Sequence, residues 1–108
     1  MLAVAGCASA PPPTEEMAAA ELAVRQVQNS PAQTHAPAEL RQARNKFEEA
    51  EQAMGSEDYI RARRLAEQAV VDAQLADVKA DAAISKASVE SIEQTINALE
   101  SESLELSR

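Results

Sequence analysis

Residues 58–108 read DYIRARRLAEQAVVDAQLADVKADAAISKASVESIEQTINALESESLELSR. The stretch contains neither Pro nor Gly, the two residues that most strongly interrupt helices. Its apolar residues recur every three or four positions, and this spacing places them on one side of an α-helix. We therefore predict one unbroken helix over residues 57–106, about 75 Å long. The rest of the chain is organised around it.

Two apolar stripes run along this predicted helix. The first consists of small side chains that let a neighbouring helix approach closely, namely Ala62, Ala66, Ala69, Ala73, Ala76, Ala80, Ala83 and Ala87. The second is bulkier and consists of Val71, Leu75, Val78, Ala82, Val89, Ile92, Ile96, Leu99 and Leu106. From Val89 onward the second stripe follows a heptad, with Ser85 and Ser103 as imperfections at inward positions.

Two shorter helices are predicted upstream, over residues 15–29 and 38–54. Pro31 interrupts the chain between them, and Pro37 suits the first turn of the second helix. Gly55 is expected to close that helix and Ser56 to cap the long one. Because this turn is short, the helices on either side of it should lie antiparallel.

The inward faces of these two helices are also predicted. In the first they are Met17, Ala20, Val24 and Val27, and in the second Leu40, Ala43, Phe47, Ala50 and Met54. The hairpin register then opposes Glu48 to Arg63, Arg44 to Glu67, Leu40 to Val71, and Phe47 to Leu65 and Ala66. Arg61, Arg63 and Arg64 are expected to pair with Glu48, Glu49 and Glu51.

The predicted fold class is therefore all-α. It is an antiparallel helical hairpin or a slender three-helix bundle, with one very long C-terminal helix protruding as a coiled-coil-like arm. Residues 1–13 form a leader and tether, and residues 14–108 form the helical domain.

Composition limits the classes of function. A chain of 108 residues with 2% aromatic residues builds a slender helical body rather than a large globular core. A net charge of -8 argues against a nucleic-acid partner, which requires a basic face. No stretch is long and apolar enough to predict a membrane-spanning helix.

The N-terminal residues Val4-Ala5-Gly6-Cys7 resemble a bacterial lipobox, in which the Cys becomes the lipid-bearing terminus. We expect a signal peptide ahead of Cys7, a lipid such as palmitate on it, and a Pro-rich tether through Pro13. Ala8 is not the Asp that retains lipoproteins in the inner membrane, so we expect the inner leaflet of the outer membrane, facing the periplasm. The alternative is a cytosolic protein with an ordinary free Cys.

A family resemblance rests on two motifs, the segment from Pro37 to Lys46 and the run from Asp58-Tyr59 to Asp72-Ala73. These residues resemble a family of bacterial lipoproteins catalogued as a domain of unknown function, the 4398 type. Some members carry an OmpA-like domain after the helical part, but none of the residues quoted belongs to such a domain. The Asp58-Tyr59 motif is also similar to part of a tetratricopeptide helix pair, although a true repeat would turn again after about 34 residues.

Catalytic chemistry is not indicated. His35 is the single histidine, in a polar loop without a second metal ligand nearby, so neither a metal nor a cofactor is expected. With two Gly residues the chain lacks a phosphate-binding loop, and we predict that it is not an enzyme.

The expected function is a lipid-anchored structural or helix-docking scaffold of the cell envelope. Its expected partners are the membrane, through Cys7, and an envelope protein or a second copy, through Val89, Ile92, Ile96, Leu99 and Leu106. Glu93, Glu100 and Glu102 flank that seam, and we expect no Lys or Arg to pair with them in a second copy, which favours a partner with basic flanks or a weak homodimer. The alternatives are a transient periplasmic chaperone or adaptor, and a frayed tail that docks nothing.

Overall fold

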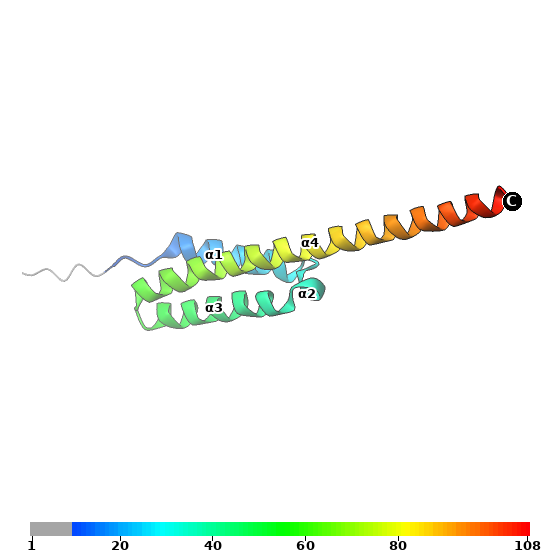
Figure 1. Ribbon diagram of the computed structural model, residues 1–108. Helices are drawn as coiled ribbons and strands as arrows, with labels where there is room; N and C mark the ends of the chain where they lie inside the picture. The colour runs from blue at the N-terminus through cyan, green and yellow to red at the C-terminus, as the bar shows by residue number, and fades with distance from the viewer. Residues whose placement is uncertain (1–9) are drawn as a thin grey trace, which may run out of the picture.

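The computed structural model describes residues 10–108, which form four helices and no strand. These are α1 (Thr14–Gln28), the single turn α2 (Ala32–His35), α3 (Pro37–Gly55) and α4 (Tyr59–Leu106). In Figure 1, α1 and α3 lie along the first half of α4, whose second half projects alone to the C-terminus. The all-α prediction of a slender bundle with a protruding arm is confirmed, and the helix bounds differ by one or two residues.

The core of the bundle is built mainly from alanine. Six residues of the alanine stripe on α4 are at most 3% exposed, namely Ala62, Ala66, Ala69, Ala73, Ala76 and Ala80. Ala20 of α1 and Ala43 and Ala50 of α3 are fully buried in the same cluster. A methyl group is the largest side chain that fits where helix backbones approach closely, so the first stripe decides which face of α4 carries α1 and α3.

One apolar pair predicted for the hairpin, Leu40 with Val71, is wrong. Val71, which should have faced Leu40, is 61% exposed. Phe47, predicted on the inward face, is partly buried and packs against the core. The predicted inward residues Leu40, Ala43 and Ala50 are buried, but on α4 the close approach of the helices favours the alanine stripe over the bulkier stripe that contains Val71.

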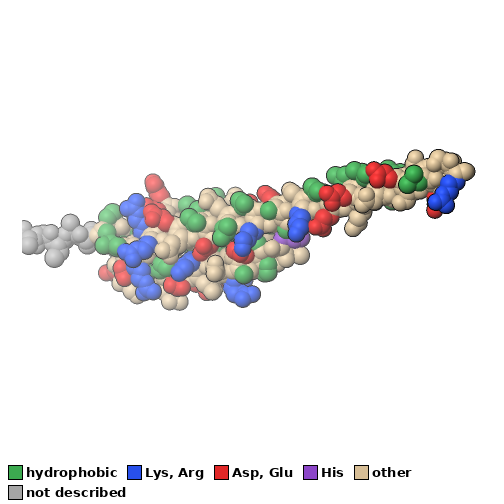
Figure 2. Space-filling view, viewed as in Figure 1, with side chains coloured by type: hydrophobic (Ala, Val, Ile, Leu, Met, Phe, Trp, Pro, Cys, Tyr) green, Lys and Arg blue, Asp and Glu red, His purple; other side chains and the backbone are tan. Residues whose placement is uncertain are grey.

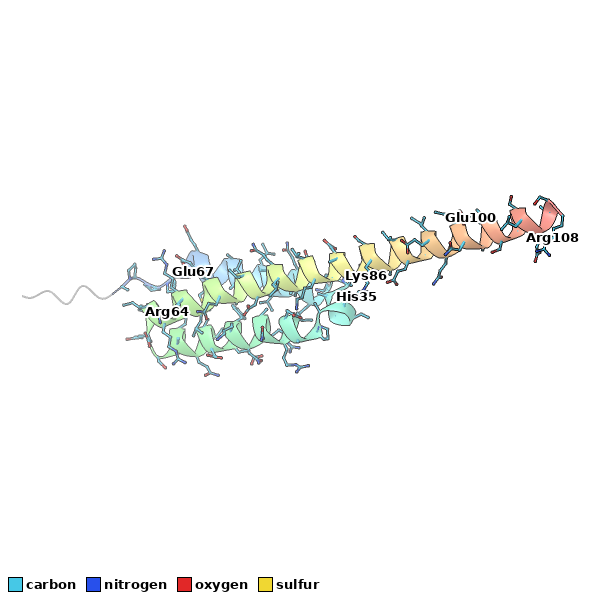
Figure 3. The ribbon with its side chains drawn as sticks, viewed as in Figure 1. His35, Arg64, Glu67, Lys86, Glu100 and Arg108 are labelled. Carbon is cyan, nitrogen blue, oxygen red and sulfur yellow. The ribbon has the colours of Figure 1, made fainter. Side chains whose placement is uncertain are left out.

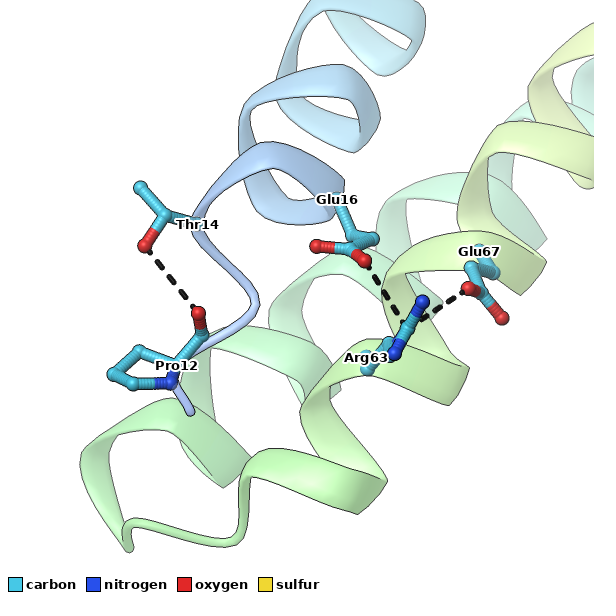
Figure 4. Close-up of polar contacts among 5 residues, drawn as sticks. All are labelled: Pro12, Thr14, Glu16, Arg63 and Glu67. Atoms are coloured by element: carbon cyan, nitrogen blue, oxygen red, sulfur yellow. Dashed lines mark hydrogen bonds and ion pairs between the residues drawn. The ribbon is translucent and has the colours of Figure 1, made fainter. Parts of the chain in front are cut away.

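The ion pairs of Arg63 differ from the expected pairing with Glu48, Glu49 and Glu51. Arg63 lies between Glu16 of α1 and Glu67 of its own helix, with its Nε 3.1 Å and 3.3 Å from their Oε1 atoms (Figure 4). The expected pairing of Arg61 with Glu49 is present at 3.9 Å. Because Arg63 is 62% exposed, its contacts orient α1 on α4 more than they stabilise the bundle.

The turn between α3 and α4 uses a different residue from the one expected. The amide of Asp58 donates to the carbonyl of Ala53 (2.9 Å) and that of Glu57 donates to Met54 (3.1 Å), the two hydrogen bonds of a Schellman motif. Glu57 occupies the left-handed position with φ 58°. Gly55 is instead the last helical residue, and Asp58 rather than Ser56 caps α4 by accepting a hydrogen bond from the Arg61 amide at 3.3 Å.

The segment predicted as a loop between the first two helices contains α2. Ser30 organises the turn, since its Oγ donates to the Val27 carbonyl (2.9 Å) and accepts from the Ala32 amide (3.1 Å). Ala32 and Ala36 are buried, so this turn closes the bundle at the end from which the arm leaves. His35 lies at that end, near Lys86 of α4 (Figure 3).

Candidate docking surface

The arm consists of residues 84–106, every one of which is exposed. Ala80 is the last buried residue of α4. Beyond it the helix continues for about 40 Å without another helix beside it (Figure 1). This is the half of α4 that sequence analysis expected to remain uncovered.

All five residues predicted to bind a partner lie on one side of the arm. Their exposed fractions are 53% for Val89, 59% for Ile92, 47% for Ile96, 60% for Leu99 and 81% for Leu106. Hydrophobic side chains are visible along the arm, with acidic side chains among them (Figure 2). The structure therefore brings the predicted residues together on one side of the arm and leaves them exposed.

The same apolar side continues past the arm and over the bundle. Val71, Leu75 and Val78 are 61%, 43% and 64% exposed, although they lie where α1 and α3 cover α4. We call the whole line the α4 seam, and its members are Val71, Leu75, Val78, Ala82, Ser85, Val89, Ile92, Ile96, Leu99, Ser103 and Leu106. Every one of them is exposed.

The seam is one heptad pattern throughout. Its steps alternate between four and three residues from Val71 to Leu106, so Leu75 and Val89 share position a while Val71 and Ile92 share position d. The buried alanines occupy positions b and f, on the opposite side of the helix. The heptad predicted from Val89 onward therefore extends back to Val71, and the unbroken alternation of steps before Val89 is the sequence signal of this extension.

Charged residues flank the seam unevenly. Between Ala87 and Ser107 the arm carries five glutamates and no Lys or Arg. Lys79 and Lys86 precede them at heptad position e, the same position as Glu93 and Glu100. Lys86 forms no ion pair within residues 10–108, whereas Lys79 bonds to Glu39 of α3.

That bond has an electrostatic consequence. The hydrogen bond from Lys79, together with a backbone hydrogen bond and the charge of Lys79, lowers the pKa of Glu39 below 4.5, against a smaller opposing effect of desolvation. The Glu39 carboxylate is therefore ionised near neutral pH, and it holds α3 to α4 next to the seam residue Val78.

The arm is a weak helix by itself. The Thr95 hydroxyl donates to the Ser91 carbonyl and the Ser101 hydroxyl to the Asn97 carbonyl, each at 3.0 Å. Such bonds compete slightly with the helix, and most helical stability in proteins comes from packing of an amphipathic face, which the arm does not have within this chain. A partner that covers the apolar side would supply the missing stabilisation.

The surface also has two concavities away from the middle of the seam. A concavity of about 450 Å³ is lined by His35, Ile84 and Ile92, where the arm leaves the bundle. One of about 330 Å³ lies between Pro11 and Tyr59 at the opposite end. Across residues 10–108, no group of three or more His, Cys, Asp or Glu side chains could hold a metal ion. Within the same range, no helix has the length and apolarity required to cross a bilayer.

The predicted lipidation site, Cys7, lies outside the described residues. The described chain begins at Ala10, and its Pro11–Pro13 segment lies beside Tyr59 and Ile60. This is the end of the bundle farthest from the C-terminus (Figure 1).

Comparison with known proteins places the chain in a family. No curated protein and no solved structure matches it. Residues 15–92, more than two thirds of the chain, match the family described as a domain of unknown function (DUF4398). The match covers α1, α2, α3 and α4 as far as Ile92, and it agrees with the resemblance seen in the sequence. The chain therefore belongs to the DUF4398 family.

Proposed function

We propose that this protein is a lipid-anchored scaffold of the bacterial cell envelope that docks a helical partner along α4 and has no catalytic activity. The observation that carries the proposal is the α4 seam, an apolar line exposed from Val71 to Leu106. Exposed apolar surface of this extent is unfavourable in water, and an amphipathic helix face is a common recognition surface for another helix.

The position of the tether supports the anchoring part. A lipid on Cys7 would hold the Ala10 end of the bundle at a membrane, while the arm tip lies at the other end of the molecule. An anchored bundle with a distant apolar arm suits a protein that brings a partner to a membrane surface.

Anchoring is tested by fatty-acid labelling and membrane fractionation in cells. The parent chain, expressed behind its signal sequence, should incorporate label and sediment with membranes, and Cys7→Ser should do neither. Equal labelling of the two proteins would contradict anchoring at Cys7.

Docking is tested with a photo-crosslinking residue placed beside the seam at Thr95, and at Gln94 on the opposite side as a matched control. Crosslinks are expected from position 95 and not from position 94, and Ile92→Asp/Ile96→Asp should abolish them. Crosslinks of equal yield from both positions, or crosslinks that survive the double substitution, would exclude the seam as the docking surface.

A further inference from the structure

We propose that the partner of the α4 seam is α4 of a second copy of this chain. The two helices run antiparallel in the register that places Val89 of one copy against Ile92 of the other. The inference rests on the proposed docking function and names its partner. It depends on the finding that the seam begins at Val71, because Leu75, Val78 and Ala82, which would pack against Leu106, Ser103 and Leu99 of the second copy, precede the arm.

In this register the seam residues of the two copies pack against one another without a layer of two small side chains. In an antiparallel coiled coil each a residue packs beside a d residue of the other helix. The three small seam residues each meet a large one in the layers Ala82–Leu99, Ser85–Ile96 and Ser103–Val78. The end layer joins Leu75 to Leu106, so the contact spans residues 75–106, about 48 Å.

A parallel pair would pack less well. Each seam residue would then meet its own counterpart, and Ala82, Ser85 and Ser103 would produce three layers of small side chains. Such layers leave space that the surrounding helix backbones cannot close, and each unfilled layer costs stability. The distribution of small residues along the seam therefore favours the antiparallel direction.

The flanking charges also select the antiparallel register. Lys86 lies next to Glu93 of the second copy, and Lys79 lies next to Glu100, with each pair formed twice by the two-fold symmetry. A shift of one heptad in either direction would set Lys86 against Lys86 or Glu93 against Glu93. A like-charge contact, Asp81 with Glu102, remains at position g. Because Lys79 already bonds to Glu39 of its own chain, Lys86, which has no ion pair within residues 10–108, carries the selection of the register.

The bundles do not obstruct this arrangement. Ala80, the last buried residue of α4, lies level with Ser101 of the second copy. The buried parts of the two copies are therefore about 30 Å apart along the axis. The buried alanines against which α1 and α3 pack lie on the side of α4 opposite the seam. The two bundles thus stand at opposite ends of the dimer, and each arm tip lies on the exposed seam of the other copy's bundle.

The first test is a charge exchange, measured by sedimentation equilibrium on the full chain carrying Cys7→Ser. Lys86→Glu and Glu93→Lys should each raise the dimer dissociation constant about ten-fold, because two attractive pairs become repulsive. The double variant Lys86→Glu/Glu93→Lys should return to the parent value. Failure of the double variant to recover would overturn the register, since in a parallel pair Lys86 would lie near Asp81 instead.

The second test is disulfide formation between two singly substituted chains. Ser85→Cys mixed with Ile96→Cys, both with Cys7→Ser, should give a crosslinked heterodimer under mild oxidation. Neither variant alone should crosslink, because positions 85 and 85 lie about 16 Å apart along the axis in this register. A disulfide formed by Ser85→Cys alone would show a parallel pair and overturn the proposal.

The outcomes separate this proposal from the docking function. If the parent remains monomeric at hundreds of micromolar while the position-95 crosslinks in cells persist and join a different protein, the second copy is excluded and docking stands. If Ile92→Asp/Ile96→Asp changes neither the crosslinks nor the oligomeric state, both proposals fail.

Discussion

In the turn between α3 and α4, Glu57 has the left-handed conformation that was expected of Gly55, and Gly55 belongs to α3. Glu57 is held at φ 58°, a conformation that is unfavourable for a residue with a Cβ atom. Gly55 is helical, and a Cβ added to it would meet no atom within 4 Å. The conformational freedom of glycine is therefore not used at position 55, and position 57, which would favour glycine, is occupied by Glu57.

We expect Gly55→Ala and Glu57→Gly each to stabilise the protein by about 0.5–1 kcal/mol, the first through helix propensity and the second by relieving backbone strain. The measurement is urea unfolding of each variant against the parent. Glu57→Ala is the matched control, since it removes the charge but keeps the Cβ, and it should give no such gain. Equal stabilisation by Glu57→Ala and Glu57→Gly would assign the effect to charge.

The Glu39–Lys79 contact predicts a pH dependence. Because Lys79 lowers the pKa of Glu39 in the folded protein below 4.5, the contact stabilises the fold fully above that value. The stabilisation is lost as the pH falls through the lowered pKa, when the carboxylate takes up a proton. Lys79→Met should raise the pKa of Glu39 in an NMR titration and should reduce stability at pH 7 more than at pH 2.

Lys46→Met removes a lysine that lines the groove between α3 and α4, and it serves as the control. It should leave the titration of Glu39 unchanged. If both substitutions move the Glu39 titration equally, general positive charge rather than the specific contact lowers its pKa.

Along α4, the alanine stripe has two different environments. Ala66 is fully buried between helices, whereas Ala87, in the same stripe and one turn into the arm, is exposed. Burial on this face leaves no room for added methyl groups, so the same substitution should have different effects at the two positions.

Ala66→Leu should destabilise the bundle by about 1–3 kcal/mol through overpacking. Ala87→Leu should change stability by less than about 0.5 kcal/mol because Ala87 is exposed and its surface concavity beside His35 has room for a larger side chain. The free energies of unfolding from urea titration provide the comparison. A loss at Ala87 as large as that at Ala66 would mean that another helix covers the arm on its alanine side.

The whole molecule combines a packed bundle with an arm that lacks tertiary contacts in a single chain. Local stability follows packing, so the two parts should open independently in the monomer. In the proposed dimer the two arms cover each other, and the starts of the two α4 helices stand about 95 Å apart. Two lipid tethers at those ends would lay such a dimer along one membrane surface.

Hydrogen exchange should report this division. At low concentration, amides of residues 88–104 should exchange far faster than those of residues 62–80. Raising the concentration should protect residues 88–104 in the parent, but not in Ile92→Asp/Ile96→Asp. Protection of the arm that is high and independent of concentration in both proteins would contradict the dependence of the arm on a partner.

The sequence by itself determined the three longer helices, α1, α3 and α4, and the uncovered C-terminal half of α4, but not the single turn α2. The absence of Pro and Gly after Gly55 and the spacing of three and four residues were sufficient to predict α4, because helix formation depends on local propensity and periodicity. The lengths of the helices were sufficient to predict the uncovered arm, since α1 and α3 are too short to reach it. Helical periodicity also predicted that one side of α4 carries Val89, Ile92, Ile96, Leu99 and Leu106.

Only the tertiary structure decided which side of α4 faces the bundle. Both stripes are apolar, and periodicity gives their positions on the helix without saying which is buried. The distance between helix backbones decides, and close approach selected Ala66 and Ala73 over the larger Val71 and Val78. That choice left the heptad exposed over the bundle as well as the arm. The docking surface therefore extends to Val71, and Lys79 and Lys86 lie beside it.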